Sequence, residues 1–404
     1  MPEGSKERGS ILGGVVKSLP NGEMGNILIL NVLYSFIAAA LGVIIPLYML
    51  HLKIDVSYIG LIISLGPLVF LILRVFFASF ADEIGTRMIN ILSSVSNLGA
   101  IAVYALLATP LGFAFGSFLE GIRMSAFWAV VRTDILFVNG HVHASKTLAH
   151  FSGLRQLGDG LGRFLIGFAI VVFAFQGSFL LISVLSIIML VLTLKIGHGG
   201  SNGRKVGPDK GLRAGMFSRI AKKRPLSFWQ ASILLMLIFV VINTLSSFLI
   251  PVYFTAGLNL SYEETGIFLA LFSLFTAVAT LLSIKYDIHT GILLFLAFLM
   301  VPGLIMMPFM GRNILIPAIL LALGSAACNI LNEYVIVDQV LRSRDVSTDI
   351  GVLYVPLKLV EFSFLAVGGF VIARYGYVPL FAVQALFVIA FVISMALASK
   401  RSAG

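Results

Sequence analysis

The chain has 404 residues, of which 59% are hydrophobic and only 11% are charged, and its mean hydropathy is +1.04. A water-soluble protein carries about a quarter charged residues, so this composition excludes a soluble exterior and predicts a surface that faces the lipid bilayer. A net charge of +10 is also found in proteins that bind nucleic acid, but most Lys and Arg residues here lie between apolar segments, where they set membrane topology. We therefore expect no nucleic-acid partner.

Apolar segments of about twenty residues, the length that crosses a hydrocarbon core of about 30 Å, follow one another along the chain. They predict twelve helices, at residues 27–50, 56–80, 88–108, 111–131, 150–173, 178–196, 228–253, 264–284, 290–310, 313–338, 351–373 and 377–398. The polar first 23 residues do not form a cleavable signal peptide, and the first apolar segment is long enough to span. The predicted fold is an all-α polytopic membrane protein with about twelve transmembrane helices.

A long basic interruption divides the apolar segments into two groups of six. The predicted organisation is a cytoplasmic N-terminal segment at 1–26, a six-helix half at 27–196, a basic cytoplasmic linker at 197–227, a second six-helix half at 228–398 and a cytoplasmic tail at 399–404. With both termini on one side of the membrane, 20 of the 28 Lys and Arg residues fall on that side and 3 on the other. By the positive-inside rule we expect both termini in the cytoplasm of a plasma-membrane protein, which we expect to be a monomer.

The two groups of segments repeat each other. The sequence IPLY at residues 45–48 is echoed by IPVY at 250–253, and Asp82 by Asp287, each 205 residues later. Six spans per repeat is an even number, so the two halves have the same orientation in the membrane. Such repeats form two pseudo-symmetric bundles with a substrate site between them, near the midplane of the membrane.

The predicted loop between the second and third spans carries the sequence ASFADEIGTR at residues 78–87. It resembles the signature G-x-x-x-D-R/K-x-G-R/K-R/K of the major facilitator superfamily. Asp82, Gly85 and Arg87 match, whereas the first glycine and one basic residue of the signature are replaced. The resemblance implies that Asp82, Gly85 and Arg87 form a cytoplasmic latch between the halves. The alternative is that Asp82 only caps the helix that follows.

Ionisable residues within the spans cost about 2.5–3.5 kcal/mol each to insert, so they require partners or a function. Glu120 and Arg123 lie three residues apart and therefore on one helical face, as do Lys358 and Glu361. Three further charged residues follow one another at intervals of four and therefore lie along one helical face, namely Arg155, Asp159 and Arg163. In the superfamily that the chain resembles, spans five and eleven line the contact between the halves. The resemblance therefore implies that Arg155, Arg163 and Lys358 form ion pairs at this seam.

Four carboxylates within the spans are candidate proton carriers, namely Glu120, Asp159, Glu333 and Glu361. The charged form of a carboxylate is disfavoured at low dielectric unless a cation is near, so its proton affinity can depend on which side is open to water. Of the four, Glu333 has no neighbouring base in the sequence, and we expect it to be protonated at rest. The alternative is that the carboxylates form static ion pairs that fix helix packing.

In the superfamily that the chain resembles, spans one, four, seven and ten line a central cavity. The candidates for substrate contact on these spans are Asn31, Tyr34, Arg123, Asn243, Asn329 and Asn332. Asn243 is accompanied in span seven by Ser246 and Ser247. Hydrogen bonding between helices would explain these polar residues equally well. We expect Arg74, near the end of span two, to extend its charged group to the cytoplasmic face.

Motifs of other functional classes are missing from the sequence. It contains no Walker-type loop for ATP, no cofactor motif, no catalytic cluster within the spans and only one cysteine, Cys328, so we expect no metal site and no enzyme. The expected function is secondary active transport of a small-molecule substrate by alternating access, coupled to protons or another ion, as in an efflux antiporter. The alternatives are an uptake symporter, a uniporter or a polytopic membrane enzyme.

Overall fold

The computed structural model describes residues 21–139, 144–195, 220–286, 288–340, 343 and 346–403, and the regular secondary structure in these ranges is helical throughout. The N-terminal half contains α2 (Asn21–His51), α3 (Val56–Ile84), α4 (Arg87–Leu106), α5 (Pro110–Asn139) and α6 (Ala144–Lys195). The C-terminal half contains α8 (Leu226–Thr244), α9 (Ile250–Val252), α10 (Tyr262–Lys285), α11 (Thr290–Phe298), α12 (Met300–Met306), α13 (Leu315–Val340), α14 (Val346–Leu353), α15 (Val355–Tyr375) and α16 (Val378–Ala403). The predicted all-α polytopic fold is confirmed.

Ten helices of the described residues are long and apolar enough to cross a membrane. One of them, α6, contains two of the predicted spans, because its 52 residues are interrupted at Ala174, whose φ of 54° and ψ of −175° bend the chain sharply. The 30-residue α5 is not among the ten, because Glu120, Arg123, Arg132 and Asp134 lower its hydropathy. The described helices are therefore consistent with twelve crossings.

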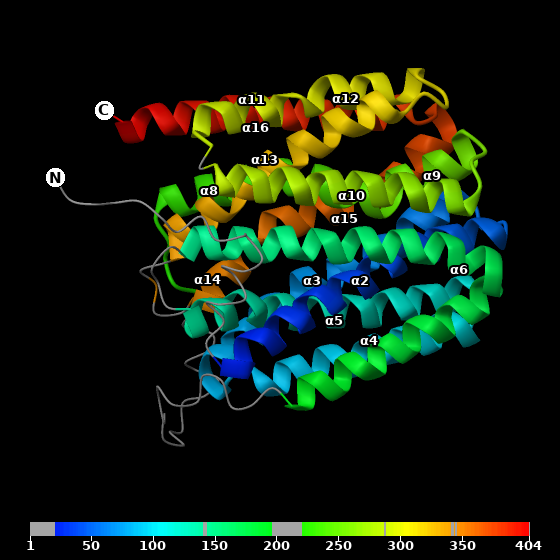
Figure 1. The fold of residues 1–404 in the computed structure, drawn as a ribbon, viewed down its shortest axis with the longest axis horizontal. Helices are drawn as coiled ribbons and strands as arrows, with labels where there is room; N and C mark the ends of the chain where they lie inside the picture. The colour runs from blue at the N-terminus through cyan, green and yellow to red at the C-terminus, as the bar shows by residue number, and fades with distance from the viewer. Residues whose placement is uncertain are drawn as a thin grey trace, which may run out of the picture.

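The helices lie roughly parallel, with the N-terminal half in the lower part of Figure 1 and the C-terminal half in the upper part. The start of α2 and the end of α16 lie at the same end of the bundle (Figure 1), which we call the termini face; the other end is the far face. The halves meet where α3 packs against α15 and where α6 packs against α10. We call this boundary the seam.

Spans seven and eleven of the C-terminal half are each irregular near a proline. Span seven passes from α8 through two π-helical turns, Leu245–Leu249 and Tyr253–Gly257, which flank Pro251. Proline has no N–H to donate within a helix, and the wider π turns accommodate this break. Span eleven is divided into α14 and α15 at Tyr354, two residues before Pro356. The short α14 reaches across the seam and packs against α3 and α5.

The loop between α2 and α3 is fixed by a helix cap. The Asp55 carboxylate accepts a hydrogen bond from the backbone N–H of Ser57 at 2.8 Å. Hydrogen bonds from Ser57 hold the pKa of Asp55 below its usual value. Since the pKa is lowered in the folded state, this cap stabilises the loop above the unfolded-state pKa, and the stabilisation is lost as the pH falls through the folded-state pKa.

Near the far face the seam is closed by glycines. A Cβ atom on Gly60 would lie 2.6 Å from the Leu365 carbonyl oxygen, and one on Gly369 would lie 2.5 Å from the Val56 carbonyl oxygen. Gly167 of α6 and Gly266 of α10 are equally close, since a Cβ on either would lie about 3 Å from the Cα of the other. The backbones of the two halves therefore touch directly at this end of the seam.

Replacing Gly369 by Ala should lower the thermal stability of the purified protein in detergent. The added methyl group would overlap backbone atoms, and overpacking of this kind costs about 1–3 kcal/mol. Gly99→Ala in α4 is the matched control, because its new Cβ meets only the Leu119 side chain, at 3.5 Å, and should gain helix propensity. A Gly369→Ala protein that melts at or above the temperature of Gly99→Ala would contradict the close packing of the seam.

Candidate functional site

A central cavity of about 270 Å³ lies between the halves and is lined by both. From the N-terminal half α2, α3, α5 and α6 contribute, and from the C-terminal half α8, α10, α13 and α15. Drug-sized ligands occupy pockets of about 300–1,000 Å³, so this volume suits a small metabolite better than a large drug. Of the six residues predicted to contact substrate, the cavity is lined by Tyr34, Arg123, Asn243 and Asn329.

The other two predicted contacts lie elsewhere, and the expectation that they line the cavity is wrong. The amide Nδ2 of Asn31 donates to the Phe151 carbonyl at 3.5 Å, and Asn31 lines a separate cavity of about 20 Å³. Asn332 is fully buried, and neither polar atom of its side chain has a partner among the described residues. A helix turns about 100° per residue, so Asn329 and Asn332 on one span need not share a cavity.

The α5 pair lies at the cavity wall as the sequence predicted. Arg123 donates from Nη2 to Glu120 Oε1 at 2.8 Å, and the hydroxyl of Tyr104 donates to the other carboxylate oxygen at 3.1 Å. The guanidinium carbon of Arg123 lies 4.9 Å from the centre of the Tyr34 ring. These partners compensate part of the free-energy cost of burying both charges.

The α6 stripe also lines the cavity, but its expected ion pairs are absent from the described part of the chain. Arg163 donates to the hydroxyl of Ser273 on α10, across the seam, at 2.8 Å. With described residues Arg155 makes a long bond of 3.4 Å to Ser152, and its guanidinium carbon lies 4.8 Å from the centre of the Trp128 ring. Asp159 has no direct hydrogen bond or ion pair with a described residue. The prediction of seam ion pairs is therefore wrong for Arg155 and Arg163, because residues four apart share a face without their charged ends meeting.

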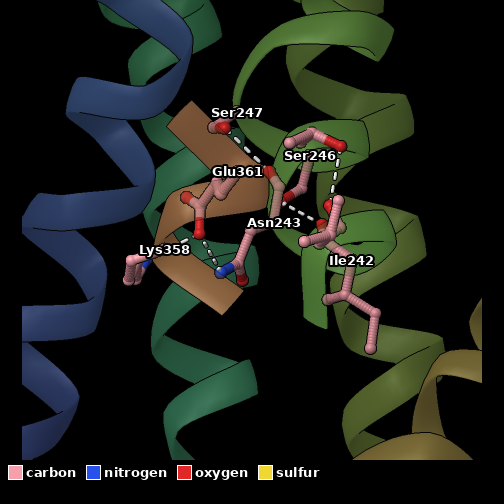
Figure 2. Close-up of polar contacts among 8 residues, drawn as sticks. Ile242, Asn243, Ser246, Ser247, Lys358 and Glu361 are labelled. Atoms are coloured by element: carbon pink, nitrogen blue, oxygen red, sulfur yellow. Dashed lines mark hydrogen bonds and ion pairs between the residues drawn. The ribbon is translucent and has the colours of Figure 1, made fainter. Parts of the chain in front are cut away.

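The α15 pair is formed as expected and joins a third residue. Lys358 Nζ donates to Glu361 Oε2 at 2.7 Å, and Asn243 of α8 donates from Nδ2 to the same oxygen at 3.1 Å (Figure 2). Lys358 Nζ also lies 4.6 Å from the centre of the Phe70 ring, on α3 of the other half. This cluster therefore connects α8 and α15 and contacts the N-terminal half.

The expectation that Glu333 lacks a neighbouring base is wrong. Arg132 donates to it twice, from Nε to Oε2 at 3.2 Å and from Nη2 to Oε1 at 2.7 Å, and both side chains are buried. The sequence placed Arg132 in a loop, whereas α5 continues to Asn139 and holds it inside the helix. The pair joins residues 201 positions apart, from opposite halves. The two parallel hydrogen bonds of the pair hold the halves together at the seam, on the side toward the termini face.

Arg74 is a further cation of the site that the sequence analysis placed elsewhere. Its side chain lines the cavity with 1% exposure instead of extending to the membrane surface. Its guanidinium carbon lies 6.0 Å from the centre of the Phe70 ring. The signal in the sequence was a cation in the last third of an apolar segment. The sequence does not show whether such a side chain extends to the membrane surface or turns into the cavity.

The predicted latch lies partly outside the described residues. The side chain of Asp82 is not among those described; Gly85 ends α3 with a φ of 93°, and Arg87 is exposed at the start of α4. At the termini face the structure also places an ion pair that the sequence did not predict. Arg224 donates to Asp349 of α14 from Nη2 at 2.8 Å and from Nε at 3.1 Å. The pair fixes the segment before α8 to the helix that reaches across the seam.

The charges around the cavity do not balance. Six cationic side chains line it, namely Arg74, Arg123, Arg132, Arg155, Arg163 and Lys358, against three carboxylates, namely Glu120, Asp159 and Glu361. Adding Glu333, the partner of Arg132, still leaves an excess of two positive charges. Five of the six cations belong to the N-terminal half. In a site of low dielectric this excess produces a positive potential.

Two membrane-embedded helical halves around a central charged cavity define a transport protein. The family model of the Major Facilitator Superfamily matches residues 27–340, and the chain belongs to this superfamily. The fold is similar to that of the human organic anion transporter MFSD10 (TETRAN), with a TM-score of 0.68 and 14% sequence identity over 93% of this chain and 100% of the human chain. No curated protein sequence matches the chain significantly. The protein is therefore an integral membrane transporter.

Changing Arg132 to Met should destabilise the protein, because it leaves the Glu333 carboxylate buried without its partner, and breaking a buried pair costs about 3–5 kcal/mol. Glu333→Leu should do the same from the other side. The double variant removes both charges and should recover most of the lost stability. Thermal unfolding of the four proteins gives the coupling energy, and losses that simply add would contradict an ion pair between the halves.

Proposed function

We propose that this transporter moves a small organic anion across the membrane by alternating access, and that the movement is linked to protons. The observation that carries the anion class is the excess of cationic side chains around a cavity shared by the two halves. An anion that binds there neutralises charges that are otherwise costly to hold at low dielectric. The cavity volume of about 270 Å³ limits the solute to metabolite size.

The similarity to MFSD10 supports the same solute class, since that protein is described as an organic anion transporter. The positive-inside distribution of Lys and Arg supports a cytoplasmic termini face in the plasma membrane. Efflux in exchange for protons and uptake together with protons would use the same binding site. They differ in whether the solute crosses the membrane in the opposite direction to the protons or in the same direction. We propose that the transporting unit is the monomer, because one chain supplies both walls of the cavity.

Arg155 is the cation best placed to contact the anion. Arg123, Arg132 and Lys358 are each held by a carboxylate within 2.8 Å. Arg155 is partly exposed, lines the cavity, and has only a long bond to Ser152 and the Trp128 ring as described partners. A solute carboxylate that binds Arg155 displaces no carboxylate of the protein. The planar guanidinium suits two parallel hydrogen bonds to such a group.

Asp159 is the carboxylate that we propose as the proton carrier. Glu120, Glu333 and Glu361 each accept a short bond from a cation, and protonation would weaken that bond. Asp159 lies between Arg155 and Arg163 on α6, lines the cavity and accepts no direct bond from a described residue. A proton on Asp159 removes one negative charge beside Arg155, so protonation and anion binding favour each other.

Arg155→Gln should weaken anion binding by about tenfold or more, because it removes the charge and leaves the cavity shape nearly unchanged. Proteoliposomes should take up labelled benzoate, hexanoate or butyrate, and should exclude benzylamine. Arg374→Gln, at the exposed end of α15, is the control and should transport like the original protein. Equal uptake of benzylamine, or unchanged affinity in Arg155→Gln, would refute the proposed anion site.

Asp159→Asn should abolish accumulation driven by a pH gradient but leave anion exchange between the two sides intact, since the amide cannot carry a proton. Asp338→Asn is the control, because Asp338 is exposed and does not line the cavity. The measurement compares gradient-driven uptake with counterflow in the same proteoliposomes. Gradient-driven uptake that survives in Asp159→Asn would exclude this residue from the proton path.

A further inference from the structure

Span seven carries a polar, uncharged face at the cavity, formed by Asn243 of α8 and by Ser246 and Ser247 of the π-helical turn that follows it. We call these three residues the α8 polar face. All three residues line the cavity and are partly exposed. Figure 2 shows them on the α8 span beside the Lys358 and Glu361 side chains of α15. They are placed to contact a solute, and their own hydrogen bonds determine which chemical group they can still bind.

The two serines have already used their only hydrogen-bond donors. The hydroxyl of Ser246 donates to the Ile242 carbonyl at 2.9 Å and is also 3.3 Å from the Asn243 carbonyl. The hydroxyl of Ser247 donates to the Asn243 carbonyl at 2.7 Å. A serine hydroxyl has one hydrogen and two lone pairs. What these residues can still offer a solute is therefore acceptor oxygen.

Asn243 also keeps an acceptor oxygen available for a solute. Its contact is with Glu361 Oε2, which also accepts from Lys358 at 2.7 Å. An ionised carboxylate only accepts hydrogen bonds, so the amide must present its Nδ2 to Glu361. The carbonyl oxygen Oδ1 remains, and it has no partner among the described residues. The α8 polar face thus presents three acceptor oxygens, and its one remaining donor is the second N–H of the Asn243 amide.

The N-terminal half presents different chemistry to the cavity. It contributes the carboxylates Glu120 and Asp159, but its arginines outnumber them, offer only donors and carry the excess positive charge. A simple carboxylate can bind this wall, but it brings no hydrogen to the α8 polar face. A solute that matches the three acceptors of the α8 polar face as well as the arginines carries an anionic group at one end and an O–H or N–H group at the other.

We infer that the substrate is a small organic anion that also bears a hydrogen-bond donor, with its anionic group held by the N-terminal arginines and its donor bound by Asn243, Ser246 and Ser247. This inference rests on the proposed anion transport and narrows its substrate class. A solute bound in this way bridges the two halves. Sites that hydrogen-bond a solute O–H or N–H group discriminate strongly against analogues that lack it, because a buried acceptor is then left without a partner.

The test measures binding to the purified full chain by isothermal titration calorimetry. The probes are three matched pairs, namely butyrate and 3-hydroxybutyrate, hexanoate and 6-hydroxyhexanoate, and benzoate and 4-hydroxybenzoate. In at least one pair the hydroxylated member should bind about tenfold more tightly. A Ser246→Ala, Ser247→Ala double variant should reduce this preference to less than about threefold while the unsubstituted member binds as before.

Ser183→Ala is the matched control. The hydroxyl of Ser183 also donates to the carbonyl four residues earlier, at 2.9 Å, but Ser183 does not line the cavity. It should keep the full preference for the hydroxylated anion. Unchanged binding of the unsubstituted anion shows in the same experiment that the double variant is folded.

Each outcome separates the two proposals. Anions that bind with equal affinity within every pair, or a preference that persists in the double variant, would overturn the inference and leave anion transport standing. If none of the six anions binds the original protein, the proposed anion site itself fails.

Discussion

The site depends on one constraint, that a charged side chain cannot face hydrocarbon without a large free-energy cost. The charged residues of the spans therefore turn toward the seam, where the other half and the central cavity provide partners. Lys358 with Glu361 and Arg132 with Glu333 show two ways of meeting this constraint, within one helix and across the halves. The lipid-facing surface stays apolar, and the polarity of the chain is concentrated at its centre.

The repeated halves are similar in fold but not in chemistry. The N-terminal half contributes five of the six cations that line the cavity, whereas the sixth, Lys358 of the C-terminal half, is paired with Glu361. The C-terminal half contributes instead the α8 polar face. In the proposed binding mode, this asymmetry would give the solute one orientation, with its charged end and its neutral polar end bound by different walls. Such a solute would contact both halves, which the proposed alternating access moves relative to each other.

The seam is held together differently at its two ends. At the far face Gly60 and Gly369 bring the backbones of α3 and α15 into direct contact. On the side toward the termini face, the pair between Arg132 and Glu333 must be broken for the halves to part. Water that enters during opening can solvate both ions, which offsets the loss of the pair. Arg132 also lines the cavity, so this ion pair lies at the cavity wall.

The sequence by itself determined the membrane fold, its repeated halves and the ion pairs within one helical turn, because apolar length and helical spacing are local properties. It thus predicted the pair of Glu120 with Arg123 correctly. It could not predict the pair of Arg132 with Glu333, which joins residues 201 positions apart, or the turn of Arg74 into the cavity. Those depend on where α5 ends and on how the helices rotate against each other. Only the tertiary structure decided which charges remain unbalanced around the cavity, because that balance is set by packing between distant segments.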